Sequence, residues 1–363
     1  MKLKIKQVGV FAAGILFCLS AMSATLPVPV DPSDPAIRYV GRFTDDYRFG
    51  WTGCKIEVDF AGSAIEAELE VVQDAEAGLT IVVDGVPTFL KAVTGQTTYL
   101  LAENLEAGVP HRIVIFKRSE GAKGTVRFNG FAVSDDGVLS RPPTPARKML
   151  VIGDSITCGY GNEALTLDEG NTTENENGYM SYASIAGRSL DADVMMFCWS
   201  GRGMYRNGPG NSADTIPQMF NQTLPKDRSL DWNHSNVVPD VIVINLGTND
   251  MRNKNRDPIG HDDFVGAYTN FLTRIRGYYP DSTLVLSIGP MQKHPVTEWL
   301  PEIASGFPDT SVLVYASFSG PEDKGGHYHP SVLKDRKMAA KLVEKIEQVT
   351  DWVRVDGPPL CVE

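Results

Sequence analysis

The stretch from Lys148 to Gly161, K-M-L-V-I-G-D-S-I-T-C-G-Y-G, constrains the fold more than any other part of this sequence. Four apolar residues, Met149 to Ile152, run directly into Gly153-Asp154-Ser155. A short apolar run that ends at glycine is typical of a buried parallel strand. Because ligands bind at the carboxyl ends of such strands, a serine at this strand-to-helix turn lies where a nucleophile belongs.

Strands and helices alternate after this stretch. Helical periodicity is clear in Asp262–Tyr279 and Ser331–Val353, where apolar residues share one face. We therefore predict an α/β domain over residues 148–356, with a parallel sheet covered by helices on both faces, and a C-terminal tail over 357–363. The expected strands are 148–153, Ala192–Cys198, Val241–Leu246, Thr283–Ile288 and Val312–Ala316.

The chain before residue 141 has an all-β pattern. Short runs rich in β-branched and aromatic residues predict seven or eight strands, and Asp84-Gly85 is a hairpin signal between two of them. This spacing is typical of a sandwich or jelly roll, which we predict over residues 24–140. Three prolines within 141–146 mark residues 141–147 as an extended connector. The expected strands are 37–43, 54–60, 63–72, 79–83, 97–101, 111–117 and 124–133.

Residues 1–23 have the pattern of a secretory signal peptide. Lys2, Lys4 and Lys6 precede an apolar run from Val8 to Leu19, and small residues near Ser23 are typical of a cleavage site. We expect a secreted or periplasmic protein with no membrane span after cleavage. Removing three lysines and no acidic residue changes the formal net charge from −11 to −14, so nucleic acid is not an expected partner.

Four cysteines follow the predicted signal peptide: Cys54, Cys158, Cys198 and Cys361. Four cysteines allow three pairings, and the sequence does not choose among them. Cys158 and Cys198 both follow expected strands, and they can meet if those strands are neighbours. Small buried thiols are the alternative.

Three further motifs accompany Gly153-Asp154-Ser155: S-G-R-G at 200–203, G-T-N-D at 247–250 and H-P at 329–330. With them the chain resembles the SGNH (GDSL-type) hydrolases, whose motifs contain a serine, a glycine, an asparagine and a histidine in this order. The resemblance implies a flavodoxin-like α/β/α domain and a serine esterase. The β-domain in front, and the wording G-D-S-I-T-C-G-Y-G, look most like carbohydrate esterase family 2, whose members remove acetyl groups from plant polysaccharides. The matching residues here are Ser155, Gly201, Asn249 and His329.

The resemblance implies a role for each of these residues. Ser155 attacks the ester and His329 takes its proton as the general base. In similar enzymes the N–H groups of Ser155 and Gly201 and the amide of Asn249 form the oxyanion hole, where each donor contributes about two to three orders of magnitude in rate. The expected substrate is an acetylated oligo- or polysaccharide such as xylan or glucomannan. Candidates for stacking on its sugar rings are Trp299, Trp232, Tyr160 and Tyr205.

The segment before the histidine departs from the superfamily pattern. Most members carry an aspartate two or three residues before the catalytic histidine, but Gly326 and His327 occupy those positions here. We therefore predict a Ser-His dyad in which a main-chain carbonyl orients His329, with Asp323 as the competing carboxylate. No cofactor or metal is expected, because His327 and His329 have no further ligand at zinc-site spacing.

Other interpretations of these motifs remain open at this point. Ser155 can cap a helix, Gly201 and Asn249 can form turns, and His329 can begin a helix. Asp154 is expected to anchor its loop rather than to react, and so is the aspartate after Asn249. At the level of function, the alternatives are a lipase or thioesterase of the same superfamily, or a carbohydrate-binding protein with an impaired active site.

Overall fold

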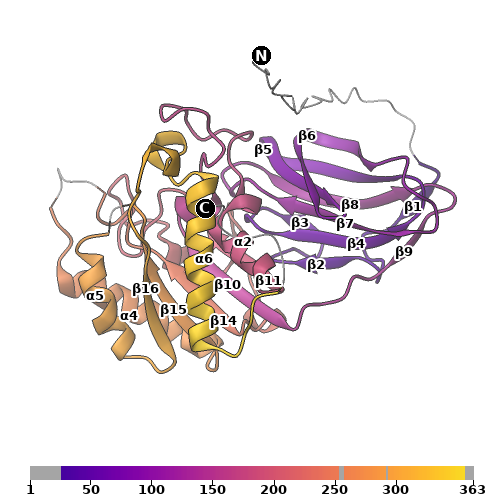
Figure 1. Cartoon of the computed structure of the whole chain (residues 1–363). Helices are drawn as coiled ribbons and strands as arrows, with labels where there is room; N and C mark the ends of the chain where they lie inside the picture. Colours follow the sequence, from indigo (N-terminus) through magenta and orange to yellow (C-terminus); the bar gives the residue numbers. More distant parts are fainter. Residues whose placement is uncertain (1–25, 253–256, 292, 356–363) are drawn as a thin grey trace, which may run out of the picture.

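The computed structural model describes residues 26–252, 257–291 and 293–355. Nine strands, β1–β9, form an N-terminal β-domain, and the rest of the chain forms an α/β/α domain beside it (Figure 1). The two-domain fold class predicted from the sequence is thereby confirmed, whereas the domain boundaries stay predictions. The predicted signal peptide and Cys361 lie outside the described residues. Within the described ranges, no helix is long and apolar enough to span a bilayer.

The β-domain is one folded antiparallel sheet with the order β1-β8-β5-β7-β4-β2, in which β3 pairs with β8, β6 with β5 and β9 with β4. The long strand β5 pairs with β8 in its first part and with β7 in its second part. The sheet therefore folds over and buries side chains such as Phe60, Leu69 and Ile115. Its strands are β1 (Val28–Val30), β2 (Arg38–Val40), β3 (Arg48–Phe49), β4 (Lys55–Ala61), β5 (Ile65–Val83), β6 (Val86–Ala102), β7 (Pro110–Lys117), β8 (Thr125–Val133) and β9 (Val138–Ser140).

Strand β5 differs from the sequence prediction. The expected strands 63–72 and 79–83 are parts of this one strand, which continues through a shift of register between Val71 and Glu76. A bulge accommodates the residues between them without ending the pairing with β6. The hairpin at Asp84-Gly85 does join β5 to β6, with φ of 50° and 83° at its two central residues.

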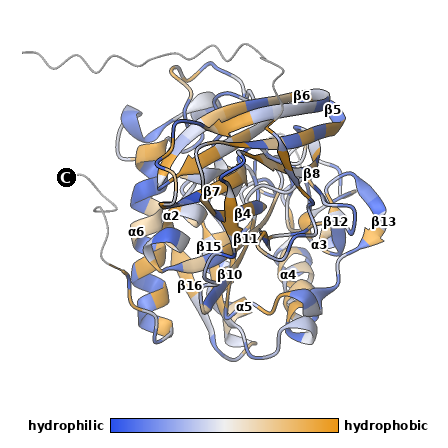
Figure 2. Ribbon diagram, turned by 90° about the vertical axis from the view of Figure 1, so that its right-hand side faces the viewer, coloured by the Kyte–Doolittle hydropathy of each residue, from blue (hydrophilic) through white to orange (hydrophobic). Residues whose placement is uncertain are grey.

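The α/β domain contains a five-stranded parallel sheet in the order β11-β10-β14-β15-β16. Alternate residues of its strands face opposite sides. Met149 and Val151 belong to the hydrophobic cluster of α2 (Tyr182–Ser189) and α6 (Val332–Val349). Leu150 and Ile152 belong to that of α4 (His261–Tyr278) and α5 (Val296–Ser305). In Figure 2 these strands lie between α6 on one side and α4 on the other. The strands are β10 (Arg147–Gly153), β11 (Ala192–Cys198), β14 (Val241–Asn245), β15 (Thr283–Ile288) and β16 (Thr310–Val314).

Helices cover both faces of this parallel sheet. Those that cover the sheet are α2 (Tyr182–Ser189), α4 (His261–Tyr278), α5 (Val296–Ser305) and α6 (Val332–Val349). Two one-turn helices, α1 (Ser155–Cys158) and α3 (Ile216–Met219), follow β10 and β11. A small hairpin, β12 (Gln222–Leu224) with β13 (Asp227–Asp231), lies outside the main sheet. The remaining turns are the 3-10 helices η1 (Gly178–Met180), η2 (His234–Asn236), η3 (Pro321–Asp323) and η4 (Gly326–Tyr328).

The β-domain packs against the edge strand β11 and shares a continuous core with the α/β domain. The ring of Trp51 lies 4.2 Å from that of Phe197 on β11, and one hydrophobic cluster contains residues of both domains. The buried guanidinium of Arg42 donates to two main-chain carbonyls of the α/β domain. Arg38 donates to Asp193 at the start of β11, at 2.6 Å. The β-domain therefore covers the edge of the parallel sheet at β11, which would otherwise be exposed.

The described cysteines are buried free thiols. Strands β10 and β11 are neighbours, and the Sγ atoms of Cys158 and Cys198 lie 2.7 Å apart. Cys54 is buried in the β-domain. Among the described residues there is thus no disulfide, which agrees with the buried-thiol alternative.

Candidate active site

Ser155 is the first residue of α1, directly after β10. Asp154 caps this helix, because its Oδ1 accepts the N–H of Ile156 at 3.0 Å. The hydroxyl of Ser155 is therefore not used as a cap. The turn is tight, and a Cβ on Gly153 would lie 2.0 Å from Oγ1 of Thr157. Glycine at this position lets the chain turn sharply and present Ser155 at the carboxyl edge of the sheet.

His329 lies opposite Ser155, on the loop that leads into α6. Its Nε2 is 2.9 Å from Oγ of Ser155, and its Nδ1 is 3.3 Å from the main-chain oxygen of His327. A carbonyl can only accept, so Nδ1 carries the proton and Nε2 presents its lone pair to the serine. Burial lowers the pKa of His329 to about 4, so the ring is neutral at pH 7 and its Nε2 is unprotonated.

An unusual turn directs the carbonyl of His327 toward the ring. His327 and Tyr328 have φ of 48° and 63°, in the left-handed region that non-glycine residues seldom adopt. The turn is bonded to the loop after α1, because Gly326 donates to the carbonyl of Gly161 and His327 to that of Leu167, both at 2.8 Å. Such strain persists only where the surroundings hold it, and it is common at functional sites.

Asp323 is engaged elsewhere. Its carboxylate is buried and accepts both the N–H and the hydroxyl of Ser319, each at 2.8 Å. It also pairs with Lys337 at 2.6 Å and with Lys334 at 3.4 Å. These partners occupy both of its oxygens, one of which takes Lys337 while the other takes Ser319 and Lys334.

Tyr160 packs on the histidine. Its ring is stacked on that of His329, with centroids 4.1 Å apart and planes at 28°. Its hydroxyl lies 3.0 Å from Nδ1 of His327. The structure thus places one of the four predicted sugar-stacking residues directly beside Ser155 and His329.

Gly201 lies in the loop after β11 with φ of 77°, and a Cβ there would meet nothing within 4 Å. Its left-handed backbone explains the glycine, and the free space in front of it is open to a ligand. Within residues 26–252, 257–291 and 293–355, no acceptor takes its main-chain N–H. This N–H is therefore available to donate a hydrogen bond to an oxygen atom of a bound ligand.

Asn249 connects three of the sequence motifs. Its Nδ2 donates to Oδ2 of Asp154 at 3.0 Å and to the carbonyl of Arg202 at 2.9 Å. Both amide hydrogens are engaged, so donation to an oxyanion requires one of these bonds to lengthen. Burial raises the pKa of Asp154 to about 7. Asp250 accepts three consecutive main-chain N–H groups of residues 204–206, at 2.7–2.9 Å, which is the anchoring role expected from the sequence.

The other predicted aromatic residues lie apart from this pair. Trp232 is only 8% exposed and belongs to the core shared by the two domains, where the guanidinium of Arg42 lies 5.5 Å from its ring. This burial disfavours the stacking of Trp232 on a sugar ring, and that role stays a prediction. Trp299 is half-buried on α5 against Phe264 of α4. Tyr205 is exposed in the Gly201 loop, and the substrate roles of Trp299 and Tyr205 stay predictions.

Comparison with known proteins identifies the family. Residues 39–143 match the model described as carbohydrate esterase 2 N-terminal, and residues 151–333 match the GDSL-like lipase/acylhydrolase family. An acetylxylan esterase / glucomannan deacetylase of Cellvibrio japonicus is 30% identical over 344 residues, which cover 92% of this chain and 94% of that protein. The chain belongs to carbohydrate esterase family 2. The resemblance inferred from the motifs is thereby confirmed.

Two further comparisons extend this result. This family 2 esterase is 34% identical over 336 residues to the cellulase/esterase CelE of Acetivibrio thermocellus, covering 89% of the present chain but only 40% of that longer protein. A family two carbohydrate esterase from Clostridium thermocellum, solved in complex with cellohexaose, has a TM-score of 0.82 at 32% identity. That match covers 87% of this chain and 100% of the solved one.

Proposed function

We propose that this family 2 esterase removes O-acetyl groups from carbohydrates, with Ser155 as the nucleophile and His329 as the general base. The observation that carries the proposal is the 2.9 Å contact between Oγ of Ser155 and Nε2 of His329, a distance suited to proton transfer. The low pKa of His329, about 4, keeps Nε2 unprotonated at neutral pH.

The reaction proceeds through an acetyl-enzyme. Oγ of Ser155 attacks the acetyl carbon while its proton passes to Nε2 of His329, and the carbonyl electrons move to oxygen. The N–H groups of Ser155 and Gly201 and one amide hydrogen of Asn249 donate to this oxyanion. The C–O bond to the sugar then breaks, and His329 gives its proton to the leaving hydroxyl. Water attacks acetyl-Ser155 by the same steps and releases acetate.

We also propose that Ser155 and His329 act as a dyad. Two observations support this: the main-chain oxygen of His327 is 3.3 Å from Nδ1 of His329, and Asp323 is bonded to Ser319 and two lysines. A carbonyl selects the same histidine tautomer as an aspartate does, although it stabilises the imidazolium less.

The proposed substrates are acetylated plant polysaccharides such as xylan and glucomannan, met outside the cytoplasm. The name of the Cellvibrio relative and the cellohexaose bound to the Clostridium enzyme support a carbohydrate substrate. The lysine-containing and then apolar residues 1–23 support export.

Acetate release from acetylated xylan, acetylated glucomannan and acetylated monosaccharides tests the proposal, with Ser155→Ala as the inactive control. We expect release by the wild type only. Nitrophenyl esters separate the alternatives: a preference for octanoate over acetate would indicate a lipase, and no turnover of any ester would indicate a binding protein.

A further inference from the structure

We propose that Glu120, which belongs to the β-domain, is a positioning residue that holds two active-site loops in place. These are the Gly201 loop (residues 199–208) and the Tyr160 loop (residues 159–177). The inference rests on the proposed catalytic roles of Ser155, His329 and Gly201, and it assigns a specific part of the reaction to the accessory domain.

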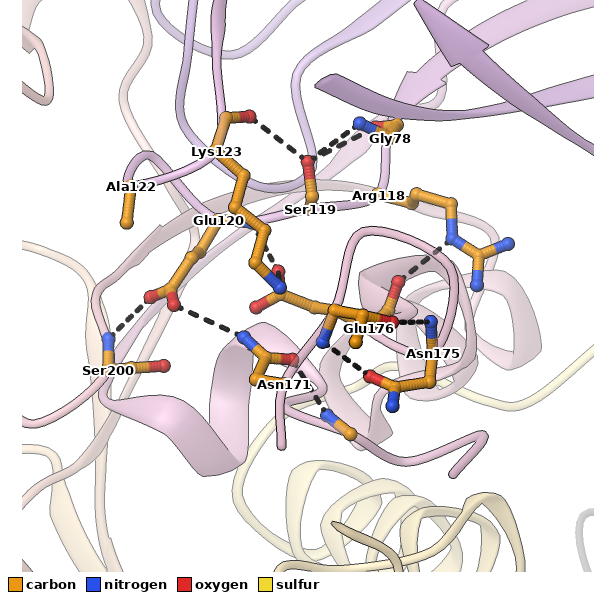
Figure 3. Close-up of polar contacts among 12 residues, drawn as sticks. Gly78, Arg118, Ser119, Glu120, Ala122, Lys123, Asn171, Asn175, Glu176 and Ser200 are labelled. Carbon is orange, nitrogen blue, oxygen red and sulfur yellow. Dashed lines mark hydrogen bonds and ion pairs between the residues drawn. The ribbon is translucent and has the colours of Figure 1, made fainter. Parts of the chain in front are cut away.

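Glu120 lies in the turn between β7 and β8, which reaches from the β-domain to the α/β domain (Figure 3). Its Oε2 accepts the main-chain N–H of Ser200 at 2.7 Å. Ser200 directly precedes Gly201, so this bond fixes the peptide next to the N–H that faces the oxyanion. The carboxylate thus acts on the Gly201 loop from the neighbouring domain.

The other oxygen of Glu120 acts on the Tyr160 loop. Nδ2 of Asn171 donates to Oε1 at 3.4 Å, and Oδ1 of Asn171 accepts the N–H of Gly161 at 3.1 Å. Gly161 is next to Tyr160, whose ring is stacked on His329. One carboxylate therefore connects the side of the site that holds the oxyanion to the side that holds the base.

The turn that carries Glu120 is itself rigid. The buried Nζ of Lys117 donates to the main-chain oxygens of Ser119 at 2.8 Å and Lys123 at 2.9 Å. The N–H of Glu120 donates to Oε2 of Glu176 at 3.2 Å (Figure 3). These bonds hold the carboxylate in one place before substrate arrives, which is what a positioning group requires.

A carboxylate here is costly for the fold. Glu120 is 4% exposed and Glu176 is fully buried. Burial, and after it the neighbouring Glu176 carboxylate, raise the pKa of Glu120 to about 7. Lys123, whose Nζ is 3.3 Å from Glu176, compensates in part. Buried charges of this kind give little net stability, and strongly perturbed ones are frequent where a site needs them.

The expected effect is on kcat. Losing one oxyanion donor costs about two to three orders of magnitude in rate. The Gly201 loop keeps other bonds, such as that from Gly208 N–H to the Gly201 carbonyl at 2.8 Å, so removing Glu120 displaces the donor only partly. We expect kcat to fall about ten- to a hundredfold, with KM changed by less than about threefold.

The experiment uses the full chain with three substitutions of Glu120, assayed for kcat and KM. Glu120→Ala removes the acceptor, and Glu120→Asp is one methylene too short to reach Ser200, so both should lose kcat. Glu120→Gln keeps a carbonyl for the Ser200 N–H but turns an NH2 group toward Nδ2 of Asn171, so its kcat should lie between those of the wild type and Glu120→Ala.

The matched control is Asp193→Asn. Asp193 is at the opposite end of β11 and bonds to Arg38 and Lys55 of the β-domain. Replacing it with asparagine therefore weakens the domain interface without changing a contact of either loop. Its kcat should equal that of the wild type. An equal fall in Asp193→Asn and Glu120→Ala would show a general interface effect and overturn the proposal.

Wild-type kcat in Glu120→Ala would also overturn it. If Glu120→Ala does not fold, the Gln and Asp variants decide, and equal kcat in these two rejects the positioning role. Ser155→Ala separates this proposal from the proposed function. An active Ser155→Ala would reject the proposed function, whereas an inactive Ser155→Ala beside an unaffected Glu120→Ala would reject the positioning role alone.

Discussion

Replacing Asp323 with alanine is expected to destabilise the protein while leaving kcat within about tenfold of the wild type. The substitution separates two accounts of His329. A catalytic triad needs Asp323 to orient the ring, whereas the dyad uses the main-chain oxygen of His327, 3.3 Å from Nδ1. His329→Ala, made alongside, should lose nearly all activity.

The cost in stability follows from the groups that Asp323 satisfies. Removing one partner of a buried ion pair costs about 3–5 kcal/mol. Lys334 is 4% exposed and keeps the carbonyl of Ser317 at 2.9 Å, while Lys337 is 37% exposed and partly reaches water. Ser319 loses an acceptor for both its N–H and its hydroxyl. We therefore expect the free energy of unfolding to fall by about 3 kcal/mol, the lower limit of this range.

Two measurements on the same samples test this expectation: urea unfolding, and kcat on a nitrophenyl acetate at a temperature where both proteins are folded. Glu322→Ala is the control, since Glu322 is the exposed carboxylate of the same turn; it should change neither quantity. A folded Asp323→Ala protein whose kcat is lower by about a thousandfold or more would refute the dyad, because misorienting the histidine of a triad costs about four orders of magnitude.

Three further predictions concern the base, the oxyanion donors and the domain interface. Protonation of His329 removes the base, and burial lowers the pKa of this residue to about 4. We therefore expect kcat/KM to stay constant from pH 7 down to about pH 5 and to fall at lower pH. A fall in kcat/KM that begins near the ordinary histidine pKa of about 6.5 would contradict this. Asn249→Ala should lower kcat by about a hundredfold, and wild-type kcat would remove its amide from the oxyanion hole. Gly201→Ala should lower kcat by at least about tenfold because its φ of 77° strains any other residue, and wild-type kcat would show that this backbone conformation is not required. A protein beginning at Pro145 would expose Phe197, which Trp51 covers, and should be insoluble or inactive, whereas a soluble, fully active product would show that the β-domain is dispensable.

The sequence was sufficient for the residues that parallel strands bring together. Ser155, Gly201 and Asn249 each follow an apolar run, and parallel strands end at one edge of a sheet. The resemblance to the SGNH hydrolases selected these residues, and the shared sheet edge explains why they lie close together. The same reasoning placed the five strands of the α/β domain to within a few residues.

Features that depend on unusual backbone or on the domain interface were not predictable in this way. The sequence predicted a main-chain carbonyl beside His329, but not the positive φ of the two non-glycine residues that direct the carbonyl of His327 there, which composition does not signal. Trp232, in a polar segment, is buried by a domain contact. Glu120 meets Ser200 only after the two domains pack, and no motif surrounds it. Such long-range contacts leave no periodic pattern in the chain.

The central claim, that Ser155 is the nucleophile of an acetyl-enzyme, is tested most directly by locating a covalent label. A fluorophosphonate reacts with an activated serine, and peptide mapping identifies the modified residue. We expect one label per chain, on Ser155, with acetate release lost in proportion to labelling and no label in His329→Ala. Labelling of another serine, or full acetate release by an enzyme completely labelled at Ser155, would contradict it.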